Sequence, residues 1–387
     1  ATVTLDSSKS SPYGTVVIAD AVRFISVDDP DEMRVAIITV YDDINDVASI
    51  QNWVDEVAAL NYNSIAVHAR YRGDATYYPN KYTSEYPNDE PRTSIAGNVD
   101  VIEEFTTRGH AAGLKVFAYV NMFLVTDGQN GDARWNHVIN QHPEWRTYYY
   151  NNGNPIVQTT AHDDEGLWLD PALPEVREDI AMVSTDIVAN YNVDGVILDR
   201  CRYPQTYWRR TSKDFGYHPT AIAKFNAHYG KSGVPDPYDT DWWEFRQNQV
   251  KQAIEKVYFQ ITNEDPDVAV LAYPIGRYND AKVYNYAKWE DWLSEELIDV
   301  VIPQIYDSSN SGFSSRCDEH RNAYTGPRLL GVATKAYTSG IDVDGQLAIA
   351  DQKGFDGTSI FRHGPTESLG YWDDILNAYN SWADFPS

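Results

Sequence analysis

Cysteine is scarce in this chain of 387 residues, which contains only Cys201 and Cys317. Two cysteines are too few for a disulfide scaffold or for a zinc site built on cysteine. They would pair in an exported protein or remain as two buried free thiols, and the sequence leaves both readings open. Long apolar runs are also missing. No stretch reaches the length of about 18 residues that a membrane-spanning helix needs, so we expect no membrane span.

Basic residues are also few compared with acidic residues. The chain has 31 Lys and Arg against 57 Asp and Glu, which gives a formal net charge of −26. A surface of this sign repels nucleic acid, so we expect no nucleic-acid partner. Aromatic residues, in contrast, reach 13% of the chain. This surplus suits flat surfaces for sugar rings, although large hydrophobic cores would use aromatic residues too.

The start of the chain is polar and lacks both an initiator methionine and an apolar leader. We interpret it as a mature chain after removal of a secretory signal, although a chain shortened for expression would begin in the same way. We therefore expect a secreted protein, extracellular or periplasmic. Two short β-like runs, 15–18 and 22–27, precede an acidic turn. They predict that residues 1–33 form an N-terminal β extension packed on the main domain.

Strand-like and helix-like segments alternate from residue 34 onward. Apolar runs of strand length recur eight times, and amphipathic segments separate them. Asp46 predicts the N-terminal cap of the first helix, whose apolar residues recur at helical spacing up to Leu60. The eight predicted strands begin at residues 34, 64, 115, 195, 268, 299, 328 and 357.

This alternation predicts a single (β/α)₈ TIM barrel over residues 34–387, in the α/β class. The extra residues fall after strands 2, 3 and 4, so we expect long loops along one side of the barrel mouth. An open doubly wound sheet is the alternative, but no Gly-x-Gly-x-x-Gly or phosphate loop follows any strand. We find no linker or repeat that indicates a second catalytic domain.

Polar residues gather where the predicted strands end. The stretch 194–199 is a short buried strand that ends in the carboxylate of Asp199, and Arg200 follows it directly. Barrel enzymes carry their chemistry at the carboxyl ends of the strands, so we expect these side chains to meet there. The candidate substrate-binding residues from this pattern are His68, Arg70, Arg72, Asn121, Arg200, Arg202, Tyr203, Tyr273, Gln304, Tyr306, Lys335, Arg362 and His363.

Several strand-end motifs resemble those of one known family. They are Val67-His-Ala-Arg-Tyr-Arg-Gly-Asp-Ala75, Ala118-Tyr-Val-Asn121, Leu169-Asp-Pro171 with Pro174-Glu-Val-Arg177, Asn190-Tyr-Asn-Val-Asp-Gly195 with Leu198-Asp199, and Ile298-Asp299 with Ile302-Pro-Gln-Ile-Tyr306. Their order is similar to that of the bacterial glycosyl-hydrolase-like family ten, also called domain of unknown function 187, from about residue 34 to 340. The resemblance implies a TIM barrel that acts on carbohydrate.

The chain departs from this family at two positions. The family usually has a second carboxylate directly after the position of Asp199, where this chain has Arg200. After Pro-Gln-Ile-Tyr the family usually has an aromatic residue, where this chain has Asp307. A carboxylate lost at one strand end and gained at another suggests a relocated acid/base. Asp307 could equally bind only a sugar hydroxyl.

Glycoside cleavage needs two carboxyl groups, one to protonate the leaving oxygen and one to attack carbon or activate water. We assign Asp199 as the nucleophile, or as the base if the enzyme inverts. Asp307 is our candidate acid/base, and Asp74, Asp164 and Glu165 are its rivals on the long loops. The alternative for Asp199 is a strand-end aspartate that caps a loop, and the alternative for Asp307 is a turn or helix-cap aspartate.

Cations are concentrated at the strand ends of this acidic chain. They are Arg70, Arg72, Arg200, Arg202, Arg277, Lys335 and Arg362. Guanidinium groups bind carboxylate and sulfate oxygens in pairs, so the cluster predicts an anionic glycan, sulfated or uronic. These cations could instead neutralise Asp199, Asp307 and Asp74. His68 and His363 could ligate zinc, but no metal-binding spacing supports this, and we expect neither a metal nor a cofactor.

The sequence therefore predicts a secreted glycoside hydrolase that cleaves internal bonds of a polysaccharide. Two alternatives come from different classes. The arginine at position 200 favours a non-catalytic carbohydrate-binding barrel, and the two histidines allow a metal-dependent barrel hydrolase. No pattern in the sequence predicts the oligomeric state.

Overall fold

The computed structural model describes residues 32–83, 90–126, 134–161, 165–205 and 213–379. The predicted β runs of the N-terminal extension lie outside these ranges. The last residue of that segment, Met33, opens the first strand of the barrel. Among the described residues, no helix is both long enough and apolar enough to cross a membrane.

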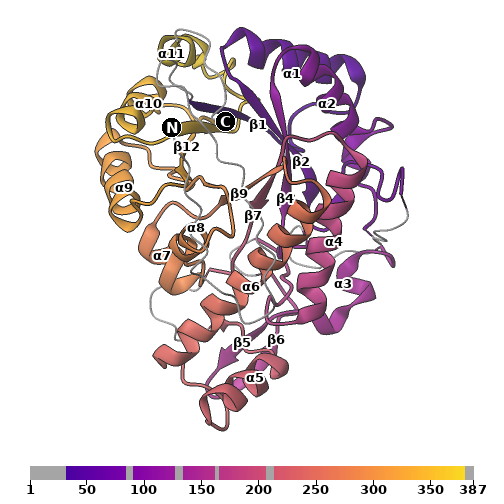
Figure 1. The fold of residues 1–387 in the computed structure, drawn as a ribbon, viewed down its shortest axis with the longest axis vertical. Coiled ribbons are helices and arrows are strands. Elements are labelled where there is room, and N and C mark those ends of the chain that lie inside the picture. The colour runs from indigo at the N-terminus through magenta and orange to yellow at the C-terminus, as the bar shows by residue number, and fades with distance from the viewer. Residues whose placement is uncertain (1–31, 84–89, 127–133, 162–164, 206–212, 380–387) are drawn as a thin grey trace, which may run out of the picture.

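Parallel strands form a barrel at the centre of the molecule, and helices surround it (Figure 1). The sheet order is β11-β10-β9-β7-β4-β2-β1-β13-β12. Gly331 separates β11 from β12 within one extended segment, so pairing of β11 with β10 and of β12 with β13 completes the ring. The barrel strands are β1 (Met33–Ile38), β2 (Ser64–Tyr71), β4 (Lys115–Asn121), β7 (Gly195–Asp199), β9 (Ala269–Tyr273), β10 (Val300–Val301), β11 (Leu329–Leu330), β12 (Val332–Lys335) and β13 (Gly357–Phe361). The predicted TIM barrel is confirmed.

Helices cover the outside of the barrel between successive strands. Asp46 caps the first of them as predicted, because its side chain accepts a hydrogen bond from the Ser49 backbone N–H at 2.8 Å. The helices of four or more residues are α1 (Val47–Ala59), α2 (Val101–Ala111), α3 (Val138–Gln141), α4 (Pro174–Asn190), α5 (Pro219–Tyr229), α6 (Thr240–Glu264), α7 (Tyr278–Tyr284), α8 (Trp289–Ser294), α9 (Asn310–Ala323), α10 (Val343–Gln352) and α11 (Trp372–Ala378). Two short helices, α7 and α8, follow one another between β9 and β10.

Side chains alternate between the barrel interior and the helical layer, as the period of two in a strand requires. In β7, Ile197 belongs to the interior cluster, whereas Val196 and Leu198 pack in the cluster under the helices. The same alternation directs Asp199 to the interior side. The interior ends in a layer of tyrosines that includes Tyr119 and Tyr273. The strand-end carboxylate therefore lies above a filled core.

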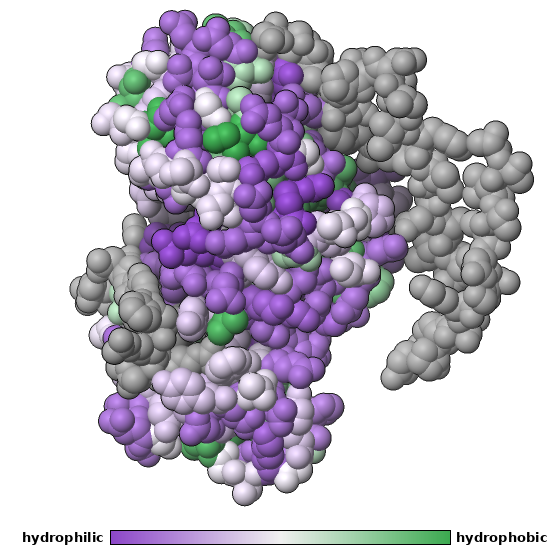
Figure 2. All heavy atoms as spheres, turned by 90° about the vertical axis from the view of Figure 1, so that its left-hand side faces the viewer, coloured by the Kyte–Doolittle hydropathy of each residue, from purple (hydrophilic) through white to green (hydrophobic). Residues whose placement is uncertain are grey.

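The long loops after β4 and β7 carry structure that the sequence did not predict. They form a three-stranded sheet of β5 (Tyr148–Asn151), β6 (Asn154–Val157) and β8 (Asp214–Phe215). Its side chains pack with α5 and α6 in a separate cluster that contains Tyr217, Phe225 and Trp242. This unit extends the molecule at the bottom of Figure 1. The face in Figure 2 is mostly hydrophilic, and its hydrophobic residues form small separate patches.

A buried ion pair joins this small unit to the barrel. Arg246 on α6 and Asp214 on β8 are both fully buried, and Nη1 of the arginine lies 2.8 Å from Oδ1 of the aspartate. The hydroxyls of Tyr286 and Tyr217 also donate to Asp214, at 2.8 and 3.2 Å. The Arg246 guanidinium lies 3.8 Å from the centre of the Tyr286 ring. Both carboxylate oxygens of Asp214 therefore have partners.

We expect Arg246→Met to destabilise the protein by about 3–5 kcal/mol, because it leaves the Asp214 carboxylate buried without its cation. Denaturant unfolding followed by circular dichroism measures this loss. The control Lys256→Met lies on the same helix and removes only the partly exposed pair with Glu178, which should cost less than about 1 kcal/mol. Equal losses in the two variants would show that the buried pair has no special role.

Candidate active site

A cavity of about 430 Å³ opens at the carboxyl ends of the barrel strands. Its walls come from β2, β4, β7 and β13, and from the segments that follow β1, β4, β7, β9, β10 and β12. They combine charged groups with tyrosine rings, which is the composition expected of a polar-ligand pocket. The lining residues are Tyr41, His68, Tyr71, Arg72, Tyr119, Asn121, Leu124, Glu165, Asp199, Arg200, Arg202, Gln205, Ile275, Gly276, Gln304, Tyr306, Tyr337 and Phe361.

Asp199 lies at the floor of this cavity and is 6% exposed. One carboxylate oxygen, Oδ2, accepts a hydrogen bond from Asn121 Nδ2 at 3.0 Å, and the other, Oδ1, accepts one from Gln304 Nε2 at 2.9 Å. Asn121 is the register partner of Asp199 across β4 and β7. The donors come from opposite sides, so they fix the plane of the carboxylate and hold it in one orientation.

Arg200 connects Asp199 to a second carboxylate. Its backbone has a φ of +54°, in the left-handed region that a non-glycine residue rarely adopts. Its Nε lies 3.7 Å from Asp199 Oδ2, and its Nη1 lies 2.7 Å from Glu165 Oε1. Arg202 reaches the same Glu165 oxygen at 2.9 Å. The sequence suggested Glu165 only as one of three rival acids, and the structure brings it into the cavity beside Asp199.

The two arginines determine the charge state of Glu165. Burial alone would raise the pKa of this carboxyl, but Arg202 and Arg200 outweigh that effect and hold the pKa below its usual range. Glu165 is therefore an anion at neutral pH. A general acid must carry a proton, so this carboxyl cannot serve as one while both arginine contacts are in place.

His68 presents a neutral imidazole to the cavity. Its Nδ1 accepts a hydrogen bond from the Val40 backbone N–H at 3.3 Å, which leaves the proton on Nε2. Burial, and then the nearby charges of Arg72 and Arg200, lower its pKa to about 3. The β2–β4 pairing shifts register between His68 and Arg70, which turns the two side chains to different surroundings. His68 is thus suited to donate a hydrogen bond to a neutral or anionic ligand group.

Asp307 lines a second cavity of about 480 Å³ rather than the one that holds Asp199. The two cavities share wall residues such as Gln205, Gly276 and Gln304, so they are neighbouring compartments of one cleft. Asp307 Oδ1 accepts hydrogen bonds from the backbone N–H and the hydroxyl of Ser309, at 3.1 and 3.2 Å. The carboxylate therefore lies at the turn that starts α9.

Six of the predicted binding residues do not line either cavity. Arg70 is fully buried, pairs with Glu90 and donates to the backbone oxygens of Asn121 and Met122. It therefore supports the strand that carries Asn121. Of the other five, Tyr203 donates a hydrogen bond to Asp170, and Tyr273 belongs to the interior core. Lys335 donates to Ser308, and Arg362 pairs with Asp42. His363 packs against Tyr62.

The remaining predicted residues do meet in the cleft. His68, Arg72, Asn121, Asp199, Arg200, Arg202, Gln304 and Tyr306 all line the cavity of Asp199. Among the rivals to Asp307, Asp74 pairs with Arg134 at 2.6 Å, and Asp164 lies outside the described residues. Sequence reasoning missed the aromatic walls. Tyr119 lies near the end of β4, Tyr71 and Phe361 end β2 and β13, and Tyr337 follows β12, so the strand-end pattern could have included all four. Tyr41 has no such signal.

Cys201 and Cys317 are both buried free thiols. Within the described ranges, no group of three or more His, Cys, Asp or Glu side chains is placed to hold a metal ion. His68 and His363, the pair that suggested zinc, do not share the cavity.

Residues 32–341 match the model of the family described as glycosyl hydrolase-like 10. The chain belongs to this family. It is 25% identical over 277 residues to the glycosyl hydrolase DigH of Escherichia coli K12, a match that covers 65% of this chain and 56% of the relative. It is 24% identical over 273 residues to the glycosyl hydrolase YngK of Bacillus subtilis, covering 65% of this chain and 48% of the relative. The match thus spans about half the length of these relatives.

Glycoside hydrolases are among the solved structures with a similar barrel. The glycoside hydrolase domain of PgaB (BpsB) from Bordetella bronchiseptica has a TM-score of 0.63 at 12% identity, covering 91% of this chain and 99% of that domain. The catalytic domain of β-amylase from Paenibacillus polymyxa has a TM-score of 0.60 at 12% identity, covering 92% and 96%. At such identities the likeness shows the fold alone, and the family membership supports a glycosidase.

We expect the stability of the protein to fall in acid partly through His68. Its folded pKa of about 3 lies below the value of about 6.5 for an unfolded histidine, so the unfolded state binds the extra proton between these values. The free energy of unfolding should therefore decrease as pH falls through this window, by at most about 1.4 kcal/mol per pH unit from this residue. Denaturant titrations of the wild type and His68→Gln at a series of pH values measure it. The variant should show a shallower slope, and identical slopes would contradict the assignment.

Proposed function

We propose that this chain is a glycoside hydrolase that cleaves internal bonds of a polysaccharide, with Asp199 as the nucleophile, or as the base if the reaction inverts. The observation that carries the proposal is the carboxylate of Asp199 at the end of β7, held by one amide donor on each oxygen at the floor of the cleft. The aromatic walls of that cleft suit sugar rings. Extracellular action belongs to the same proposal.

The carboxylate of Asp199 can act in two ways. In a retaining reaction it attacks the anomeric carbon while an acid protonates the leaving oxygen, and water then releases the sugar from the enzyme. In an inverting reaction it removes a proton from the attacking water instead. The amide donors Asn121 and Gln304 keep the carboxylate oriented in either case, and Tyr119 and Tyr306 border the space for the sugar.

Asp307 remains our candidate for the acid. Its cavity adjoins that of Asp199, so a sugar chain in the cleft would pass both carboxyls. Glu165, the carboxyl in the same cavity as Asp199, is paired with two arginines and held as an anion. We assign Glu165 the role of fixing Arg200 and Arg202 in the wall.

Cleavage inside the chain is supported by the two connected compartments. The two cavities, of about 430 and 480 Å³, share one wall and extend the cleft to both sides of Gln304. A cleft of this form accommodates several sugar units, whereas a pocket closed at one end would release single sugars.

We expect Asp199→Asn to lower kcat by roughly 10²–10⁴-fold, because the amide keeps the shape of the carboxylate but neither attacks carbon nor accepts a proton. The assay is a screen for new reducing ends and for loss of viscosity over sulfated, uronic, neutral and amino-sugar polysaccharides. Internal cleavage lowers viscosity well before many reducing ends appear. Asp267→Asn, which alters an exposed carboxylate, is the matched control and should keep full activity.

The same assay separates the alternatives. A wild-type chain that binds a polysaccharide but cleaves none of the panel would favour the non-catalytic carbohydrate-binding barrel. Loss of activity with a chelator, restored by a divalent metal, would favour the metal-dependent hydrolase. A larger loss in Glu165→Gln than in Asp307→Asn, at equal thermal stability, would reassign the acid.

An anionic substrate is the second part of the proposal. Among the described strand-end cations, Arg277 is the one whose contacts support it. Arg72, Arg200 and Arg202 all bond to protein oxygens. Arg277 lines the second cavity, and its guanidinium makes no hydrogen bond or ion pair with the described residues beyond electrostatic attraction to Asp280. A sulfate or uronic carboxylate beside Asp307 would give it a partner.

We expect Arg277→Gln to raise KM for a cleaved sulfated or uronic polysaccharide by about 10-fold, the effect of losing about 1.4 kcal/mol of charge-assisted binding, with little change in kcat. Steady-state kinetics at two salt concentrations measures it. The matched control is Arg321→Gln, on the outer face of α9 against Phe355. A wild type that cleaves only neutral polysaccharides, or an unchanged KM, would remove the anionic part of the proposal and leave the hydrolase part intact.

A further inference from the structure

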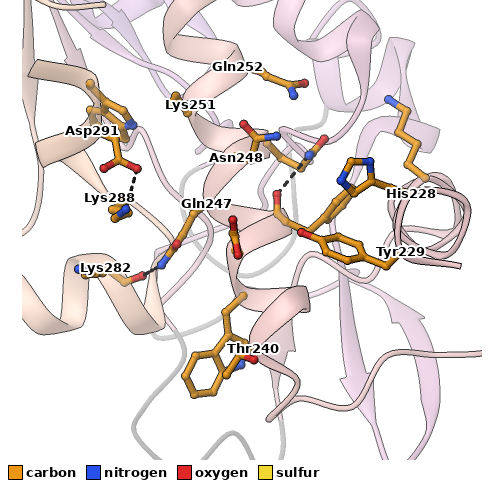
Figure 3. Close-up of a pocket in the computed structure, with 16 residues that line it drawn as sticks. His228, Tyr229, Thr240, Gln247, Asn248, Lys251, Gln252, Lys282, Lys288 and Asp291 are labelled. Carbon is orange, nitrogen blue, oxygen red and sulfur yellow. Dashed lines mark hydrogen bonds and ion pairs between the residues drawn. The ribbon is translucent and has the colours of Figure 1, made fainter. Parts of the chain in front are cut away.

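A cavity of about 900 Å³ lies on the outside of the barrel, in the layer of helices. Its floor is α6, and Figure 3 shows Gln247, Asn248, Lys251 and Gln252 of that helix between two walls. One wall is the end of α5, and the other is formed by α7 and α8. None of its lining residues belongs to the catalytic cleft.

Several polar groups in this cavity have no partner among the described residues. The side chains of Glu244 and Asn248 are exposed and make no hydrogen bond or ion pair there, and the ring nitrogens of His228 are equally free. The indole N–H of Trp292 is fully buried and also lacks an acceptor. The exposed side chains of Glu244, Asn248 and His228 are therefore the groups available to a polar ligand in this cavity.

Aromatic rings lie among these polar groups. Tyr229 and Trp243 are half-buried and line the same cavity. The indole N–H of Trp243 donates to the Pro237 backbone oxygen at 2.6 Å, which fixes the ring. Fixed aromatic faces beside free amide and imidazole groups suit a ligand with C–H faces and many hydroxyls. A sugar chain has both.

The lysines of the cavity argue against a phosphate or nucleic-acid ligand. Lys251 pairs with Glu295 at 2.7 Å, Lys282 with Glu290 at 3.0 Å and Lys288 with Asp291 at 2.8 Å. These three charges are therefore already met by carboxylates, and the fourth lysine of the cavity, Lys224, donates to the Ala172 backbone oxygen at 2.9 Å. A polyanion would have to break these pairs in a chain of net charge −26. A ligand in this cavity would therefore be recognised through its hydroxyl groups and its ring faces.

The cavity continues along α6. A smaller cavity of about 420 Å³ shares Gln252 with it and extends to Phe259, which is 49% exposed. From Trp243 to Phe259 the helix rises about 24 Å at 1.5 Å per residue. A linear ligand of several sugar units matches this length better than a compact one. We call these two adjoining cavities, which are lined by Tyr229, Trp243, Asn248, Gln252 and Phe259, the α6 groove.

We propose that the α6 groove is a second binding site for a polysaccharide chain, separate from the catalytic cleft. This inference rests on the proposed function, because it assigns the groove to the polymer that the cleft cleaves. A second attachment point raises the local concentration of polymer at the cleft, so it should lower the KM for long chains and leave short oligosaccharides unaffected.

Affinity electrophoresis tests the groove without requiring cleavage. The full chain is run in native gels that contain polygalacturonate, dextran sulfate, pullulan or soluble chitosan. The variants are Asp199→Asn in the cleft, the double change His228→Ala and Asn248→Ala in the groove, and Trp243→Ala. Asn98→Ala, an exposed amide in the turn before α2, is the matched control. The two changes in the double variant lie at exposed positions, so it should fold normally, which a thermal melt verifies.

We expect at least one polysaccharide to retard the wild type, Asp199→Asn and Asn98→Ala alike. The groove variants should lose about 10-fold in affinity for that polymer. Retardation by none of the four polymers, or equal retardation of the groove variants, would overturn the proposal. Enhanced dimer formation of the wild type, removed by the groove changes in sedimentation, would assign the groove to a second copy of the chain instead. Polymer binding by the groove with no cleavage of any substrate would keep this inference and reject the hydrolase.

Discussion

The parallel register of β4, β7 and β9 is the constraint on which the candidate site depends. It puts Asn121 and Tyr273 opposite Asp199 on the two neighbouring strands. Asn121 on the neighbouring strand β4 donates to one oxygen of the carboxylate, and the closed barrel brings Gln304, which follows β10, to the other. A slip of one residue would turn Asp199 from the interior to the helical layer, and the cleft would lose its central group.

Opposite charges within the wall form the next level of organisation. Arg200 lies between Asp199 and Glu165, and Arg202 reinforces the contact with Glu165. The strand-end cations therefore serve mainly to arrange carboxylates and loops, as Arg70 does with Glu90. Arg200 therefore has a structural role at the position where the family usually has a carboxylate. The arginine holds a carboxylate from the loop after β4 beside the one on β7.

Elements that bury a regular apolar stripe were predictable, and elements stabilised by distant contacts were not. The strands of the barrel and the start of α1 at Asp46 follow from local pattern and capping. Helix α9 has only Phe313, Cys317 and His320 buried, so its sequence lacks an apolar stripe. Strand β5 pairs with β8 and packs against α5 and α6, all of which lie far later in the sequence. No short window contains that information.

The sequence by itself determined the repeat of the barrel, the strand ends and the carboxylate of Asp199, because burial period and turn residues are local properties. Only the tertiary structure decided which polar strand-end residues face the cleft. Glu165 and Arg200 are separated by 35 residues and meet through the path of a long loop, whereas Arg70 turns away to Glu90. Contacts of this kind depend on how the closed sheet positions loops from different strands. A linear pattern of residues does not record that arrangement.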